Sequence, residues 1–206
     1  SLVNGSINRG VYSISTKGKR KKALSTEAGT NSAAFSSDFT YYINTYSSAM
    51  TPYRFTLHDA SDGKLVKEIK DNSALLNKLD GYEISPKEFS TINVNGYDLN
   101  MYMIKPANFD PNKKYPLFMF QYSGPGSQQV SNSWMGSNDY WHQLLASEGY
   151  VVACVGGRGT GLKGRDFKKL TQKELGKYEV EDQITAAQQL SDLPYIDENR
   201  TGIWGW

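Results

Sequence analysis

The sequence predicts two parts of different fold class, an antiparallel all-β part followed by an α/β part with a mixed, largely parallel sheet. Residues 1–70 contain short stretches of alternating polar and apolar residues separated by polar turns, which is typical of antiparallel strands. From residue 87 onward, apolar strands alternate with helical segments, and this order favours parallel strands joined by helices. The 14 Tyr and 19 Gly also suit strands and tight turns better than a helical bundle.

Composition and charge exclude several classes of protein. The formal net charge of +2 provides no bulk attraction to nucleic acid. Cys154 is the single cysteine, so no internal disulfide can form. No apolar run approaches the ~20 residues that a membrane-spanning helix needs. We therefore expect a soluble globular piece with no nucleic-acid partner and no membrane span.

In the first part, four strands are expected close together along the chain. Asp62-Gly63 separates the last two of them, and Asp-Gly is a strong signal for a tight β-hairpin. Four short strands in about 60 residues match one blade of a β-propeller. A lone blade cannot bury both faces of its sheet, so we expect residues 1–70 to be the C-terminal part of a larger propeller. The strands are predicted at residues 10–15, 34–46, 53–59 and 64–69.

Residues 71–86 are expected to connect the two parts, with a short helix at 71–79 that Asp71 or Ser73 caps. The α/β part then opens with a hairpin, because Asn95-Gly96 supplies the two positive φ angles of a type I′ turn. The remaining strands and helices follow from buried apolar runs and from helical periodicity. They are the hairpin strands at 89–94 and 97–104, strands at 115–122, 150–155 and 202–206, and helices at 138–148 and 180–193.

The last predicted strand ends in Gly205-Trp206. In an α/β-hydrolase, the nucleophile occupies Gly-x-Ser-x-Gly on a sharp turn between a strand and a helix, and Gly205-Trp206 would be the Gly-x before that serine. A glycine in a buried strand can equally serve packing alone, so the spacing leaves both interpretations open. On the first interpretation, residues 87–206 form the first half of an α/β-hydrolase catalytic domain.

Four motifs add to this pattern: Tyr-Ser-Gly-Pro-Gly-Ser-Gln at 122–128, Gly-Arg-Gly-Thr-Gly at 157–161, Glu-Val-Glu-Asp-Gln at 179–183 and Ile-Trp-Gly-Trp at 203–206. In this order and spacing they resemble the prolyl oligopeptidase family of serine peptidases, and within it the dipeptidyl peptidase IV subfamily. The likeness is dense over residues 97–206 and thinner before them. It implies a β-propeller joined to an α/β-hydrolase domain, with no zinc, nucleotide or organic cofactor.

The resemblance implies that the chain is a fragment of a serine exopeptidase that releases Xaa-Pro or Xaa-Ala dipeptides through an acyl-enzyme. It places the Ser-Asp-His triad beyond Trp206, so the chain alone is expected to be inactive and not to react with a fluorophosphonate probe. It further implies a homodimer and an exported location such as a bacterial periplasm or cell envelope. Two alternatives remain, a tripeptidyl or acylaminoacyl peptidase of the same family and a non-catalytic adhesion or receptor protein with a degenerate hydrolase domain.

Because the resemblance places the triad beyond Trp206, the catalytic residues expected within the chain belong to the oxyanion site. The resemblance implies that the hydroxyl of Tyr122 donates a hydrogen bond to the oxyanion, whereas the residue pattern alone favours a packing role at a strand end. Gly124 and Pro125 are expected to fix the path of the following loop. Gly205 would keep the nucleophile turn clear of side chains, and Trp206 would shape it.

Other sequence patterns are better explained by structural roles than by catalysis or ligand binding. The match to Gly-x-Gly-x-x-Gly at 159–164 lacks the helix and the acidic residue of a dinucleotide site. The basic run at 17–22 is expected to be a solvated turn. The acidic residues at 179–182 are expected to stabilise the N-terminus of a helix through its dipole rather than to bind a metal ion. Structural roles are also expected for His58, His142 and Cys154.

Overall fold

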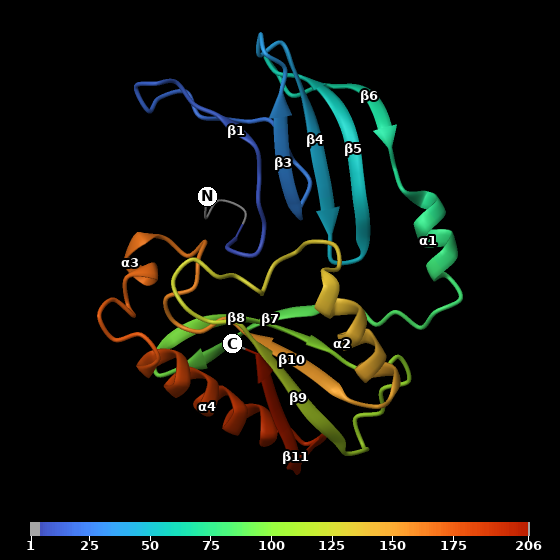
Figure 1. Cartoon of the computed structure of the whole chain (residues 1–206), viewed down its shortest axis with the longest axis vertical. Helices are drawn as coiled ribbons and strands as arrows, with labels where there is room; N and C mark the ends of the chain where they lie inside the picture. The colour runs from blue at the N-terminus through green and yellow to red at the C-terminus, as the bar shows by residue number, and fades with distance from the viewer. Residues whose placement is uncertain (1–4, 206) are drawn as a thin grey trace. The chain divides into compact units, whose positions relative to one another are not determined.

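The computed structural model describes residues 5–205, and the chain divides into two compact units (Figure 1). Within the described residues, the first unit comprises residues 5–82 together with Ser131–Met135. The second comprises Glu83–Val130 and residues 136–205. The sequence predicts a connector at residues 71–86 between the two parts. The division into two units does not distinguish this connector, so its boundaries stay a prediction.

A four-stranded antiparallel sheet forms the first unit, in the order β3-β4-β5-β6. The turn between the last two strands places Gly63 at a φ of +79°, and its N–H donates to the carbonyl of Asp59 at 2.9 Å. The predicted Asp-Gly hairpin is therefore confirmed, and the sheet has the architecture of a single propeller blade. Its strands are β3 (Thr30–Phe35), β4 (Tyr41–Ser48), β5 (Thr51–Asp59) and β6 (Leu65–Lys70).

The prediction of the first two blade strands was wrong. The run at 34–46 is divided between β3 and β4, because Asp38 forms a tight turn by accepting hydrogen bonds from the Ser36 hydroxyl at 2.6 Å and the Thr40 N–H at 3.1 Å. The run at 10–15 lies outside the blade. Its central residues form β1 (Tyr12–Ser13), which pairs only with β2 (Lys22–Ala23).

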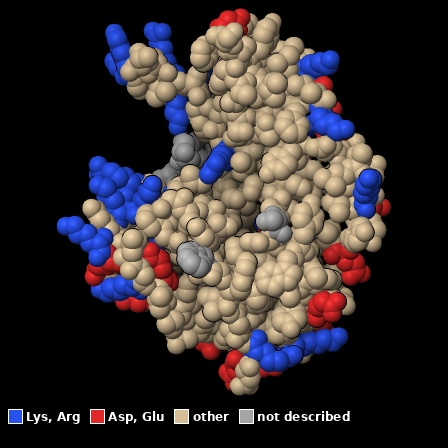
Figure 2. Space-filling model, viewed as in Figure 1, with Lys and Arg blue, Asp and Glu red and all other residues tan. Residues whose placement is uncertain are grey.

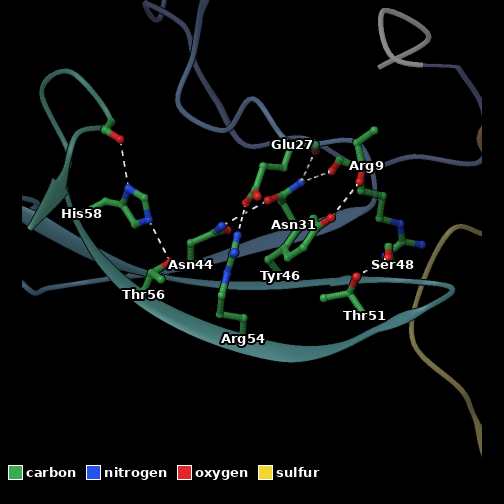
Figure 3. A network of polar contacts seen from close by, with 12 residues as sticks. Arg9, Glu27, Asn31, Asn44, Tyr46, Ser48, Thr51, Arg54, Thr56 and His58 are labelled. Atoms are coloured by element: carbon green, nitrogen blue, oxygen red, sulfur yellow. Dashed lines mark hydrogen bonds and ion pairs between the residues drawn. The ribbon is translucent and has the colours of Figure 1, made fainter. Parts of the chain in front are cut away.

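Polar side chains cover one face of the blade (Figure 3). Side chains on this face bond to one another. The Asn44 side chain donates to Asn31 at 3.1 Å, and Arg54 pairs with Glu27, which precedes β3. His58 belongs to the same network, since its ring stacks on Tyr42 and its Nε2 lies 2.8 Å from the Thr56 hydroxyl. This environment agrees with the structural role predicted for His58.

Helix α1 (Ser73–Leu79) follows the blade, as predicted, but its cap differs from the prediction. The N-cap is Asn72, which adopts a left-handed conformation with φ +58° and makes no side-chain capping bond. Asp71 instead accepts a hydrogen bond from the N–H of Ser73 at 3.1 Å. Neither Asp71 nor Ser73 is therefore the N-cap.

The second unit contains a five-stranded mixed sheet in the order β11-β9-β10-β8-β7. Asn95 and Gly96 have φ angles of +52° and +83°, which confirms the predicted type I′ hairpin between the first two strands. β10 is antiparallel to β8 and parallel to β9, and β11 is parallel to β9. The strands are β7 (Glu88–Val94), β8 (Tyr97–Ile104), β9 (Tyr115–Gln121), β10 (Val151–Val155) and β11 (Ile196–Gly205).

Helices cover both faces of this sheet, as an α/β-hydrolase domain requires (Figure 1). On one face, α4 (Lys177–Ser191) places Ala186 in the same apolar cluster as Met119 of β9. On the other face, α2 (Ser137–Ser147) packs Trp141 and His142 against the rings of Phe118 and Phe120. Successive side chains of a strand point to opposite faces, so β9 is buried between the two helices.

Three details of the α/β part were not predicted. Strand β11 begins at Ile196 rather than at residue 202. A short helix, α3 (Arg165–Lys168), interrupts the glycine-rich segment after β10. Helix α4 begins three residues before its predicted start, because the carboxylate of Glu179 accepts a hydrogen bond from the N–H of Gly176 at 2.9 Å and caps the first turn.

Candidate active site

Strands β9 and β11 end side by side and form the floor of a pocket. Gly205 pairs in register with Gln121, so the next residue after β9, Tyr122, lies beside the end of β11. The carboxyl ends of parallel strands are a common location of ligand sites in open α/β sheets. The pocket has a volume of about 370 Å³ and is lined by Phe120, Tyr122, Gln129, Asn138, Trp204 and Gly205.

Tyr122 presents its side chain to this pocket and to solvent. Its side chain is 48% exposed, and its hydroxyl makes no hydrogen bond to any residue that the structure describes. A phenol that has no protein partner is free to donate to a bound molecule. The structure therefore brings two of the predicted site residues, Tyr122 and Gly205, to one pocket.

Gly205 occupies a position that only glycine fits. Its φ is +147°, and a Cβ atom built on it would lie 1.7 Å from the carbonyl oxygen of Gln121 and 2.7 Å from its carbon. Such approaches are far inside van der Waals contact, so any side chain would push β11 away from β9. Trp206, the other residue predicted to shape this turn, lies outside the described residues.

The loop that follows Tyr122 folds back on itself. The Ser127 hydroxyl lies 2.8 Å from the carbonyl oxygen of Tyr122 and 3.0 Å from that of Gly124. Gly124 has a φ of +110° and Gly126 a φ of +95°, conformations that glycine adopts without strain. Pro125 lies between them, where its ring restricts the backbone. These conformations are compatible with the role predicted for Gly124 and Pro125 in fixing the path of the loop, which stays a prediction.

A second loop holds the first one in place. The N–H of Gly161 donates to the carbonyl of Ser127 at 2.7 Å, and the side-chain amide of Gln128 donates to the carbonyl of Gly161 at 2.9 Å. These reciprocal bonds join the Tyr122 loop to the glycine-rich segment after β10. The literal Gly-x-Gly-x-x-Gly match therefore lies in a segment that supports the Tyr122 loop.

A buried ion pair anchors the second loop to helix α4. The Asp182 carboxylate is fully buried and accepts hydrogen bonds from the Arg158 backbone N–H at 2.6 Å and from its Nε at 2.8 Å. Hydrogen bonding to Asp182 raises the pKa of the Arg158 guanidinium, and the more exposed Glu181 adds a contact at 3.1 Å. The sequence analysis explained these acidic residues only by the helix dipole, and it did not predict that Asp182 and Glu181 pair with Arg158.

Replacement of Asp182 by Asn is expected to destabilise the protein by roughly 3–5 kcal/mol, because it removes the buried counter-charge of Arg158 and leaves only the partly exposed Glu181. Chemical denaturation of the complete protein, followed by tryptophan fluorescence, would measure this loss. Glu181→Gln is the matched control, since that carboxylate is partly exposed and its removal should cost less than about 1 kcal/mol. Equal, small effects of both substitutions would show that the buried pair is not an anchor.

His142 and Cys154, for which structural roles were predicted, lie in the interior of the second unit. His142 is fully buried among aromatic rings, and Cys154 is buried, which raises the pKa of its thiol to about 12. Within residues 5–205, no three His, Cys, Asp or Glu side chains come together as a metal site would require. Every helix in this range is also too short or too polar to cross a membrane.

Comparison with known proteins identifies two matching family models. Residues 137–206 match the prolyl oligopeptidase family, and residues 1–53 match the dipeptidyl peptidase IV (DPP IV) N-terminal region. The probable dipeptidyl-aminopeptidase B of Aspergillus terreus is 35% identical over 96% of this chain, which covers 22% of that relative. The probable dipeptidyl peptidase 4 of Aspergillus flavus is 37% identical over 100% of this chain, which covers 27% of that relative.

Two solved structures extend the comparison to three dimensions. The crystal structure of Porphyromonas gingivalis dipeptidyl peptidase 4 matches 100% of this chain with a TM-score of 0.93 and 47% identity, over 29% of that structure. A putative dipeptidyl aminopeptidase IV from Bacteroides ovatus matches 90% of this chain with a TM-score of 0.79 and 32% identity, over 27% of that structure. The chain spans about a quarter of the length of the proteins it matches.

Proposed function

Since this chain belongs to the prolyl oligopeptidase family, we propose that the whole protein is a serine peptidase that releases dipeptides from the amino terminus of peptides, after proline or alanine. The observation that carries this proposal is the match of the entire chain, at 47% identity, to a dipeptidyl peptidase 4 structure. The chain contributes a propeller blade and the first half of the α/β-hydrolase domain.

The pocket at the ends of β9 and β11 supports specific catalytic roles for the residues around it. The nucleophilic serine would follow Gly205-Trp206 and attack the carbonyl carbon of the scissile bond, while its proton passes to the triad histidine. The carbonyl oxygen then becomes an oxyanion, and the Tyr122 hydroxyl donates a hydrogen bond to it. Collapse of this tetrahedral intermediate expels the leaving amine, which takes the proton, and produces the acyl-enzyme that water hydrolyses.

The site of action and the assembly belong to the same proposal. Family likeness favours an exported protein, located in a bacterial periplasm or cell envelope, that acts on peptide substrates as a homodimer. Size-exclusion chromatography with light scattering and cell fractionation of the complete protein would test the assembly and the location.

Activity of the complete protein toward two chromogenic substrates tests the central proposal. We expect release of the chromophore from a Gly-Pro substrate, and none from an Ala-Ala-Pro substrate whose amino terminus lies one residue further out. Cleavage of the tripeptide substrate alone would favour a tripeptidyl peptidase of the same family. Cleavage of neither substrate, together with no labelling by a fluorophosphonate, would favour the degenerate, non-catalytic hydrolase domain.

A further inference from the structure

A second pocket adjoins the Tyr122 loop, and all the ionisable residues that line it are positively charged. Its volume is about 480 Å³, and Pro125 of the Tyr122 loop forms part of its wall. The rest of its wall is formed by α3 and the segment that follows it. The cations on this wall are Arg165, Lys168, Lys169 and Lys173.

The lysines of this pocket lack counter-charges. Arg165 bonds to its neighbour Asp166 at 2.9 Å, and the nearby Glu174 pairs with Lys177 at 2.8 Å. Lys168, Lys169 and Lys173 make no ion pair with any residue in the described part of the chain. Figure 2 shows Lys and Arg side chains gathered over α3. Three like charges around one concavity raise the local concentration of anions.

A buried hydroxyl at the same pocket also lacks a partner. Thr171 lines the pocket and is 1% exposed, and its Oγ1 has no hydrogen-bond partner among the described residues. Gly159 leaves room for it, since a Cβ atom there would lie 2.6 Å from Thr171 Oγ1. Buried hydroxyls are normally hydrogen-bonded, so Thr171 retains an unused hydroxyl donor beside the lysines, directed toward Gly159.

We propose that this lysine pocket, formed by Lys168, Lys169, Lys173 and Thr171, binds a carboxylate of the peptide substrate. The proposal rests on the proposed peptidase function. Release of a dipeptide leaves only two residues on the amino-terminal side of the scissile bond, so a carboxylate that reaches beyond the Tyr122 loop comes from the leaving peptide. The lysine pocket would then favour peptides with Asp or Glu a few residues after the cleaved bond.

The geometry of the loop keeps the lysine pocket within reach of such a peptide. The contact of the Ser127 hydroxyl with the Tyr122 carbonyl closes the loop, so Gly126 remains near Tyr122. A Cβ atom on Gly126 would lie 3.9 Å from the Nζ of Lys168. An extended peptide advances about 3.3–3.6 Å per residue, so a leaving peptide that follows the loop from Tyr122 would bring a carboxylate to the lysine pocket from a position a few residues after the scissile bond.

Peptidase assays of the complete protein test the proposal. The substrates are Ala-Pro peptides that carry either Glu or Gln at successive positions after the scissile bond. We expect wild-type kcat/KM to be about tenfold higher for one Glu peptide than for its Gln counterpart, and this preference to weaken with salt. A triple variant of the lysine pocket should lose the preference for Glu; its substitutions are Lys168→Gln, Lys169→Gln and Lys173→Gln. A control variant removes the same charge elsewhere and should keep the preference; its substitutions are Lys17→Gln, Lys19→Gln and Lys67→Gln.

Equal cleavage of Glu and Gln peptides by the wild type, or a preference that survives the triple substitution, would overturn the proposal. Inorganic phosphate distinguishes the source of the anion, because competition by phosphate without any preference for Glu would assign the lysine pocket to a free anion rather than to substrate. A neutral Gly-Pro chromogenic substrate separates this result from the proposed function. If that substrate is cleaved normally, absence of a Glu preference contradicts only the lysine pocket. If no peptide is cleaved, the proposed function fails, and the substrate-carboxylate proposal that rests on it falls too.

Discussion

Tyr122→Phe is expected to lower kcat of the complete protein by about 10²–10³-fold while changing KM by less than about threefold. The substitution removes one hydroxyl and keeps the ring that lines the pocket beside Trp204 and Gly205. The hydroxyl has no partner among the described residues, so its removal should leave folding unchanged. In the proposed mechanism, Tyr122 donates its hydrogen bond only when the carbonyl oxygen becomes negative, and for this reason the loss should appear in kcat.

Tyr82→Phe provides the matched control for this measurement. Tyr82 is 69% exposed and lies in the first unit, so loss of its hydroxyl should leave kcat unchanged within about twofold. Steady-state kinetics with a Gly-Pro chromogenic substrate would measure both variants. A Tyr122→Phe enzyme with wild-type kcat would remove Tyr122 from the oxyanion site.

Gly205→Ala is expected to abolish activity and to destabilise the α/β-hydrolase domain by about 3–5 kcal/mol. The new methyl group would lie 1.7 Å from the carbonyl oxygen of Gln121, so β11 must separate from β9 at the position where the proposed nucleophile turn would begin. The backbone angle of +147° is also unfavourable for alanine. Residual activity and the midpoint of thermal unfolding of the complete protein would report the two effects.

Gly202→Ala tests whether the effect is specific to position 205. Gly202 lies in the same strand, but a Cβ atom there would meet nothing within 4 Å. We therefore expect this variant to retain activity and to shift stability by less than about 1 kcal/mol. Similar behaviour of the two alanine variants would contradict the close approach of β11 and β9 as the reason for Gly205.

Local sequence signals predicted the parts of the fold that depend on neighbouring residues. Asn95-Gly96 specified a hairpin because few residues adopt two successive positive φ angles. The apolar run at 115–122 specified a strand covered on both faces, which β9 is. The role predicted for Gly205, to keep a nucleophile turn clear of side chains, stays a prediction, whereas the structure shows that a Cβ atom there would meet the carbonyl oxygen of Gln121 on the neighbouring strand.

Interactions between distant segments could not be predicted in this way. Asp182 follows Arg158 by 24 residues, and only the packing of α4 on the sheet brings their side chains together. The first blade strand was misplaced for the same kind of reason, since alternation at 10–15 indicates a strand but not its partner. The Tyr122 assignment depended on family resemblance, because a tyrosine at a strand end has no sequence signal that separates packing from catalysis.

The affinity of a dipeptide boronic acid for the wild type and for Tyr122→Phe tests the proposed oxyanion site most directly. The boron atom bonds to the nucleophilic serine and forms a tetrahedral anion, so the inhibitor resembles the transition state rather than the substrate. We predict that Tyr122→Phe weakens inhibition by about 100-fold or more while KM for the dipeptide substrate stays near its wild-type value. Inhibition constants that agree within about threefold would contradict a hydrogen bond from Tyr122 to the oxyanion.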